Sequence, residues 1–410
     1  MPFLIKDVRI FDGESTIENG SVLVQDGKIA HVSPSPIPFS GTTISKPGHT
    51  LLPGVIDVHI HANGGTPVAL PQALRFGVTT VCDMHNEWYN TQKLHKQREG
   101  GDCADLKTTS FAATIDMGWP MPIVLMHDPS PQTQAEVATW PKLKTPADAK
   151  QYISDRLAEG VDYIKLMHES GTVMGQTFNK PTLDLQKALI DEAHAHNLFV
   201  VAHATCLSDT LEILSLGVDG LTHTFIDQPP TPDLIAAYTK NNAHCNPTLA
   251  AMGSGTSEGL ATQERFAHDP RVQHLISAEG REQMCHCMSF AKSSSSKCAN
   301  AYETVRQLKA TGVPILVGSD AAGPAVGTAY GLSTHQEMAL LVEQCGFTPK
   351  EALEAATRVN AERFGFGDRG MIKAGMRADL VLVEGNPLEG LECMLDLRGV
   401  WTEGRVCGVY

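Results

Sequence analysis

The chain has 410 residues, of which 42% are hydrophobic and 19% are charged, values typical of a globular protein with a sizeable buried core. Its formal net charge of -14 argues against a nucleic-acid partner or an anionic membrane surface, because no basic patch offsets the acidic balance. The first residues, MPFLIKDVRIFDG, carry charges within their apolar stretch, so they are not expected to form a secretory signal. No apolar run of about 18 residues is present, and we therefore expect no membrane span.

The two ends of the chain have similar β patterns. Residues 1–52 contain the runs LIKDVRIF and SVLVQDGKIAHV, the second interrupted by a predicted hairpin turn at Asp26-Gly27. Residues 370–410 contain ADLVLVEG and GVWTEGRVCGV. Neither segment is long enough to be a stable unit by itself. We therefore predict that 1–52 and 370–410 combine into one small β-sandwich domain.

The middle of the chain, residues 53–369, alternates apolar strand runs with helical patterns. Helices are predicted over LDLQKALIDEAHAHN, PDLIAAYTKNN and YETVRQLKATG. Such alternation predicts a parallel sheet, and eight strand–helix units predict a closed (β/α)8 barrel of the TIM type. The predicted strands lie near 55–59, 78–83, 109–115, 161–166, 198–203, 219–223, 245–249 and 314–319. The fold class expected is thus α/β, with the barrel as the catalytic domain.

The longest stretch without a predicted strand runs from about 250 to 300 and carries several helical patches. An insertion at this place would lie over the mouth of the barrel, which makes it a candidate lid. A surface excursion without substrate contact is an equal alternative. The ten cysteines have no paired CxxC spacing, and a chain of this length does not need disulfides, so free thiols in a reducing cytoplasm are expected.

Six polar residues stand at the ends of predicted strands and are called here the strand-end set: His59, His61, Lys165, His203, His223 and Asp320. The carboxyl ends of the parallel strands of a barrel converge on one mouth, so these side chains are expected to meet. His59 and His61 are two residues apart on one strand and point to the same side. One such histidine is as often structural, but coincidence is improbable for the five imidazole and carboxylate residues together.

Four imidazoles and a carboxylate are typical ligands of zinc or a similar divalent ion. Lys165 does not fit this role in its ordinary form, because an ammonium group cannot ligate a cation. It must therefore be neutral, lie outside the ligand shell or be chemically modified.

Several motifs of the chain are similar to those of the metal-dependent amidohydrolase superfamily: LLPGVIDVHIHANGG, RFGVTTVCDM, VDYIKLM, VVAHA, DGLTH, VGSDA and GMIKAGMRADLVLVEGNPL. They most resemble its imidazolonepropionase-like branch, which includes Xaa-Pro dipeptidases and ochratoxin-hydrolysing amidases. The resemblance covers about 1–390 and is loosest over 84–160 and 250–300. It implies a (β/α)8 barrel with a small β-sandwich built from both termini, and homo-oligomeric assembly.

The resemblance also implies how the strand-end set is used. It implies two divalent ions, zinc being expected, with His59, His61 and Asp320 on the first, His203 and His223 on the second, and Lys165 shared as an N-carboxylysine formed with CO2. The alternative is an unmodified Lys165 that orients the substrate beside a single ion.

A binuclear site of this kind predicts hydrolysis. Two cations lower the pKa of the water between them, so that a bridging hydroxide is available near pH 7 to attack a carbonyl. Asp320 is expected to take the proton and deliver it to the leaving amine, acting as both ligand and acid/base. The predicted reaction is hydrolysis of a C–N amide bond in a small molecule: an N-acyl amino acid, a C-terminal peptide bond or an ochratoxin-like aryl amide.

Other functions remain open on the same residues. They are a single-metal deaminase or cyclic-amide hydrolase, a lactonase or a decarboxylase. A catalytically silent scaffold is a further alternative from another class, and the complete set of ligand positions counts against it.

Three residues are candidates for substrate contact. His85 in CDMHNEWYN follows the second predicted strand and could line the mouth. Ser170, with Gly171, resembles the Ser-Gly pair that follows the metal lysine in this branch. His168 departs from the small residue expected at its position, so it could reach the pocket or equally lie in a surface loop.

Overall fold

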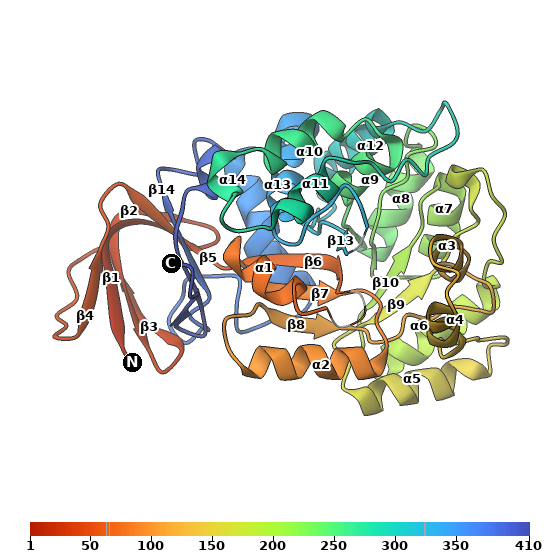
Figure 1. The fold of residues 1–410 in the computed structure, drawn as a ribbon, viewed down its shortest axis with the longest axis horizontal. Helices are drawn as coiled ribbons and strands as arrows, with labels where there is room; N and C mark the ends of the chain where they lie inside the picture. The colour runs from red at the N-terminus through yellow and green to blue at the C-terminus, as the bar shows by residue number, and fades with distance from the viewer. Residues whose placement is uncertain (63, 65, 324) are drawn as a thin grey trace.

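The computed structural model describes residues 1–62, 64, 66–323 and 325–410. Strands from both chain ends lie together at one end of the molecule, and the strands and helices of the middle segment form the remainder (Figure 1). Within the described residues, no helix combines the length and the apolar content needed to cross a membrane.

Strands from both ends form one mixed sheet in the order β16-β15-β14-β5-β1-β2-β3, with β4 pairing to β1. Their bounds are β1 (Phe3–Phe11), β2 (Thr16–Gln25), β3 (Lys28–Ser33), β4 (Thr42–Ser45), β5 (His49–Pro53), β14 (Leu380–Glu384), β15 (Leu397–Thr402) and β16 (Arg405–Val406). The structure thus has a single mixed sheet where the sequence predicted the two sheets of a sandwich. The reason is β5, which pairs in parallel with β1 and antiparallel with β14. It therefore joins the N-terminal and the C-terminal strands into one continuous sheet.

This terminal sheet curls around an apolar core of its own. Phe3 in β1 and Trp401 in β15 stack with their ring centroids 6.0 Å apart. Three strand spacings separate β1 from β15 along the sheet, which would be about 14 Å in a flat sheet. The strands must therefore curve so that residues such as Ile5, Val24 and Leu380 face one another in the interior.

The middle of the chain has two four-stranded parallel sheets, in the orders β13-β6-β7-β8 and β12-β11-β10-β9. Their strands are β6 (Val55–His61), β7 (Val78–Asp83), β8 (Asp105–Thr108), β9 (Ile164–Met167), β10 (Val200–His203), β11 (Gly220–Leu221), β12 (His244–Cys245) and β13 (Ala321–Ala322). Single parallel bridges flank the second sheet at both edges: Ala113 pairs with Leu166 of β9, and Ile315 pairs with Cys245 of β12.

Two predicted strands differ from the structure. The strand predicted at 109–115 lies earlier, at β8, because Ser110 has a left-handed backbone (φ 54°) that ends the extended run. The strand predicted at 314–319 pairs with β12 only through the bridge at Ile315. Asp320 (φ 55°) then interrupts the extended backbone before β13.

The helices follow the strands in alternation. Their bounds are α1 (Ala69–Arg75), α2 (Trp88–Glu99), α3 (Met121–His127), α4 (Pro131–Ala138), α5 (Asp148–Glu159), α6 (Leu183–Ala195), α7 (Leu207–Ser215), α8 (Pro232–Asn241), α9 (Leu249–Thr256), α10 (Leu260–Ala267), α11 (Ala278–Met284), α12 (Cys298–Ala310), α13 (Leu332–Cys345), α14 (Pro349–Glu354) and α15 (Asn360–Arg363). The predicted helices are confirmed as α6, α8 and α12. Thr182 caps α6 by accepting from the Leu185 N–H, and α8 begins with a proline.

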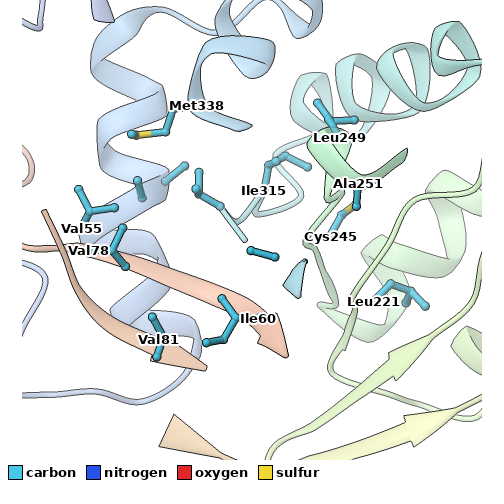
Figure 2. Packing of buried hydrophobic residues seen from close by; sticks show 14 of the residues in the cluster. Val55, Ile60, Val78, Val81, Leu221, Cys245, Leu249, Ala251, Ile315 and Met338 are labelled. Carbon is cyan, nitrogen blue, oxygen red and sulfur yellow. The ribbon is translucent and has the colours of Figure 1, made fainter. Parts of the chain in front are cut away.

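The two parallel sheets share one apolar core (Figure 2). Val55 and Val81 from β6 and β7, Leu221 from β11 and Met338 from α13 are all fully buried in it. The stretch 250–300 is largely helical, as predicted, and packs on this core through residues such as Met284. Its role as a lid stays a prediction. All ten cysteines belong to the described part of the chain and carry free thiols.

Asn360, at the start of α15, connects β6 by hydrogen bonds to the segment that leads to Asp320. Its Nδ2 donates to the carbonyl oxygens of Ile56 and Val317 at 2.8 Å each, and its Oδ1 accepts from the Val317 N–H at 3.2 Å. The side chain is fully buried. This amide thus adds to the backbone hydrogen bond from the Val58 N–H to the Val317 carbonyl oxygen, which joins the same two segments at 3.1 Å.

We predict that Asn360→Ala lowers the free energy of unfolding by about 2–4 kcal/mol, because it removes three buried hydrogen bonds worth about 0.5–1.5 kcal/mol each. Urea denaturation followed by circular dichroism measures the change. The partly exposed Asn386→Ala is the control and should stay within about 0.5 kcal/mol of the parent chain. An equal effect of both substitutions would contradict this role of Asn360.

Candidate active site

His59, His61 and Asp320 meet at the end of β6. The Nε2 atoms of His59 and His61 lie 3.2 Å and 3.3 Å from Asp320 Oδ1 and 3.4 Å from each other. Two imidazole nitrogens and a carboxylate oxygen at this separation could share one cation. The Nδ1 atom of His59 is buried and has no hydrogen-bond partner among the described residues.

The buried carboxylate of Asp57 sets the relative position of these two segments. It accepts hydrogen bonds from the backbone N–H groups of His59 and Ser319, both at 3.0 Å. It also accepts from the hydroxyls of Ser319 and Thr334, both at 2.6 Å. Because Ser319 precedes Asp320, Asp57 holds β6 and the Asp320 turn together. The sequence shows this residue only as an acid inside an apolar strand, and it was not singled out.

His203 ends β10, and His223 follows β11. Their ring centroids are 4.6 Å apart, and the His223 ring lies 4.9 Å from that of His59. The structure therefore brings the four histidines of the strand-end set together. The Nδ1 atom of His223 is 2.8 Å from Thr248 Oγ1.

Lys165 lies in β9 and is 1% exposed. Its ammonium nitrogen is hydrogen-bonded to Thr222 Oγ1. Burial lowers the pKa of Lys165 to about 7, although the Asp320 carboxylate acts in the opposite direction. A substantial share of this side chain is thus an uncharged amine near neutral pH.

Burial also keeps the imidazoles of His59, His203 and His223 neutral. It lowers the pKa of His59 to about 3, and it moves the pKa of His203 below and that of His223 well below the usual value. Burial acts to raise the pKa of Asp320, but the electrostatic interaction with the His59 ring and the hydrogen bonds from His59 and His61 outweigh it and hold the value well below the usual one. The Asp320 carboxyl is therefore ionised. Neutral imidazoles beside an ionised carboxylate are the protonation states that a divalent ion requires, so this donor set fits one.

Trp119 covers one face of His203. The two rings stack with centroids 5.1 Å apart and 21° between their planes, and Phe178 lies 5.8 Å from Trp119. Both aromatic side chains are partly exposed. Trp119 was not identified from the sequence, where its only signal is the proline that follows it in the loop after β8.

His85 lies between β7 and α2, against Trp140 with 4.4 Å between ring centroids. Its Nδ1 accepts from the Ala112 N–H at 3.0 Å. Burial lowers the pKa of His85 to about 4, so the ring is neutral and carries its proton on Nε2. This Nε2 is buried and has no partner within the described part of the chain. His85 thus presents a hydrogen-bond donor that is not used inside the protein.

The structure places His168 and Ser170 beside α6 and α7. The Nε2 atom of His168 is 2.9 Å from Glu212 Oε2, and its Nδ1 is 3.4 Å from Gln186 Nε2. The backbone N–H of Ser170 donates to Asp209 at 2.8 Å. His168 is fully buried in these contacts. The His168 side chain and the Ser170 N–H are therefore engaged by helices. The His168 N–H donates to the carbonyl oxygen of His203 at 3.1 Å, which is a backbone contact only.

Comparison with known proteins decides the family. The model of the amidohydrolase family matches residues 50–409. The chain belongs to this family. The resemblance expected from the sequence motifs is thereby confirmed, and the protein is an amidohydrolase-type enzyme with an α/β fold.

The most similar relatives differ in how much of the chain they match. A dihydroorotase of Bacillus cereus (strain AH187) is 36% identical over 93 residues, which are 21% of this chain and 22% of that protein. The chain thus spans about a fifth of the length of such curated relatives. An Xaa-Pro dipeptidase with bound methionine is 20% identical, covers 99% of both chains and has a TM-score of 0.74. The ochratoxinase of A. niger is 19% identical over 99% of this chain and 95% of its own, with a TM-score of 0.73. These two likenesses show the fold.

Glu337 connects α13 to the site. Its carboxyl group is fully buried and accepts from the N–H groups of Leu249 at 2.9 Å and Ala250 at 2.8 Å, in the first turn of α9. Thr248, which bonds His223, precedes this turn. Burial raises the pKa of Glu337 to about 8, although the two backbone hydrogen bonds oppose the shift.

We predict that Glu337 makes stability depend on pH. Between pH 4.5, its ordinary pKa, and about pH 8, the folded protein holds a proton that the unfolded chain releases. The free energy of unfolding should therefore fall as pH rises through this window, by up to about 1.4 kcal/mol per pH unit. Glu337→Gln cannot titrate and should flatten the slope. Denaturation of metal-free protein at about pH 5.5 and about pH 7.5 measures it; an unchanged slope in the variant would contradict the assignment.

Proposed function

We propose that this chain is a binuclear, metal-dependent hydrolase of C–N amide bonds in small molecules. The substrates proposed are N-acyl amino acids, C-terminal peptide bonds or ochratoxin-like aryl amides. The observation that carries the proposal is the convergence of four imidazoles and an ionised carboxylate beside a buried lysine. Membership of the amidohydrolase family supports hydrolysis, and the fold shared with a dipeptidase and an ochratoxinase favours an amide bond.

In this proposal, the strand-end set holds two zinc ions. One ion would be bound by His59, His61 and Asp320. The other ion would be bound by His203 and His223. Carboxylated Lys165 is shared: the unprotonated amine forms an N–C bond with CO2 and releases one proton, which leaves an anionic carbamate with two oxygens. The lowered pKa of Lys165 supports this step, because only the neutral amine reacts.

The ions would supply Lewis acidity for the substrate carbonyl and a lowered pKa for the attacking water. Asp320 takes the proton of that water and passes it to the amine that leaves. Its position against His59 and His61 keeps the carboxylate ionised before the reaction. The buried Nε2–H of His85 is the proposed donor to the substrate. His168 and Ser170, held by α6 and α7, fit a supporting role better than substrate contact.

We also infer that the two parallel sheets are halves of one (β/α)8 barrel. Two observations support this: the isolated bridges pair Ala113 and Ile315 with β9 and β12, the edge strands of one sheet, and both sheets contribute to one core. Residues 53–369 would then form the catalytic barrel, with 250–300 as its lid, and 1–52 with 370–410 the second domain. Homo-oligomeric assembly remains part of the proposal.

The metal content tests the proposal directly. Wild-type protein reconstituted with zinc should contain two ions per chain in the presence of bicarbonate and fewer in its absence, as measured by elemental mass spectrometry. Lys165→Ala should bind at most one ion under both conditions. Replacement of the exposed Lys292 by alanine is the matched control and should not change the count. One ion in the wild type regardless of bicarbonate would refute the binuclear site.

Asp320→Asn should lower kcat by about 10²–10⁴-fold, because the amide cannot accept the proton. The assay uses a panel of Xaa-Pro dipeptides, N-acyl amino acids and aryl amides, and mass spectrometry identifies the products. A carboxylic acid with an amine is expected, whereas release of ammonia from an amino-heterocycle would indicate a deaminase. The exposed Asp191→Asn is the control for loss of a carboxylate. Wild-type kcat in Asp320→Asn would contradict its role.

A further inference from the structure

Glu169, a residue between β9 and α6, makes direct contact with the strand-end set. It is 1% exposed. Its Oε2 atom lies 3.1 Å from His203 Nε2 and accepts from the hydroxyl of Thr205 at 2.5 Å. Its Oε1 atom accepts from the N–H of Gly171 at 2.7 Å. Both oxygens of this buried carboxylate are therefore engaged.

The contact with Glu169 determines which nitrogen of His203 is available. A carboxylate accepts hydrogen bonds, so the His203 nitrogen that faces it must carry a proton. A neutral imidazole has one N–H and one lone pair. With the proton on Nε2, the lone pair is on Nδ1, and Nδ1 is the atom that can bind an ion. A carboxylate that orients a histidine in this way is a common supporting group at metal sites.

Glu169 is placed to orient His203 rather than to act as a ligand. Its oxygens are taken up by His203, Thr205 and the Gly171 N–H, whereas Asp320 is the carboxylate that lies beside His59 and His61. Glu169 acts on the pKa of His203, where burial lowers the value and the Glu169 hydrogen bond opposes the shift. Trp119 covers a face of the same ring. The His203 ring is thus contacted at Nε2 by Glu169 and on one face by Trp119.

The residues on either side of Glu169 are fixed to α7. His168 pairs with Glu212, and the Ser170 N–H donates to Asp209. Lys180 bridges the two acids, at 2.8 Å from Asp209 and 2.5 Å from Glu212. Its ammonium group supplies the positive charge that this acidic cluster needs. The cluster therefore immobilises the short segment that carries Glu169.

We propose that Glu169 is a positioning residue that holds the Nε2–H of His203, so that Nδ1 faces the metal ion shared with His223. The metal part of this inference rests on the proposed function. The hydrogen bond between Glu169 and His203 is a property of the chain itself and can be tested without an ion.

The first test is NMR of metal-free protein labelled with 15N at histidine. His203 should give an Nε2–H proton that exchanges slowly and is shifted downfield by the carboxylate, assigned by its loss in His203→Gln. Glu169→Leu removes the acceptor and should abolish the protected signal. Glu169→Gln makes a neutral hydrogen bond at best and should move the proton upfield, whereas Glu169→Asp keeps the charge and should restore part of the shift. An identical signal in Glu169→Leu would overturn the proposal.

The second test is a zinc titration against a competing chelator. Glu169→Leu should lower the zinc affinity of the site at His203 and His223 by about 10–100-fold. It should leave the zinc affinity of the site at His59, His61 and Asp320 unchanged. Asp379→Asn is the matched control, because it removes a buried carboxylate that bonds Arg377 and the Glu403 N–H in the terminal part of the chain and takes no part in holding Glu169 or His203. It should keep both affinities. Wild-type affinity for both ions in Glu169→Leu would overturn the proposal.

The two proposals can fail separately. Fewer than two ions in the wild type would refute the binuclear function, and the Nε2–H signal would still decide whether Glu169 holds His203. Two ions in the wild type, with an unchanged Nε2–H signal and unchanged affinities in Glu169→Leu, would refute only the role of Glu169.

Discussion

The buried carboxylate of Asp57 is the contact on which the arrangement of the candidate site depends. It joins the backbone of β6 to the turn that carries Asp320, two segments separated by more than half of the chain. Burial raises the pKa of Asp57, although hydrogen bonds from Ser319 and Thr334 oppose the shift. A buried acid is costly unless its oxygens are satisfied, and here both oxygens accept. The position of His59 relative to Asp320 follows from this contact.

The same desolvation that makes Asp57 costly prepares the other side chains for a cation. Water is excluded from the strand ends, so the imidazoles of His59 and His223 lose their protons and Lys165 is partly neutral. Asp320 remains ionised because its electrostatic interaction with His59 and the hydrogen bonds that it accepts from His59 and His61 outweigh its burial. A cluster of neutral donors around one anion has no favourable positive charge of its own. Binding of divalent ions would supply that positive charge at the donor atoms that face Asp320.

Much of this arrangement could be predicted from the sequence, because strand ends in an alternating α/β chain converge whatever their exact boundaries. The strand-end set meets in space even though the third and eighth predicted strands are displaced by the left-handed residues Ser110 and Asp320. Those backbone conformations depend on tertiary contacts, and neither residue type reveals them. The continuous terminal sheet was likewise not predictable, since β5 pairs with strands from opposite ends of the chain. Glu169 and Trp119 were missed because their contacts with His203 cross between separate loops.

The segment HESG illustrates why a departure from a family pattern has to be interpreted in three dimensions. In the sequence, His168 is the unexpected residue, and a position in the pocket is a reasonable inference for it. In the structure, successive side chains alternate in direction after β9: His168 turns to Glu212 on α7, and Glu169 turns to His203. The imidazole that departs from the pattern thus anchors the segment, and the adjacent carboxylate contacts the candidate ligand. The unexpected histidine in the sequence correctly indicates that this segment lies near the site. The packing against α6 and α7 decides that Glu169, and not His168, directs its side chain to His203.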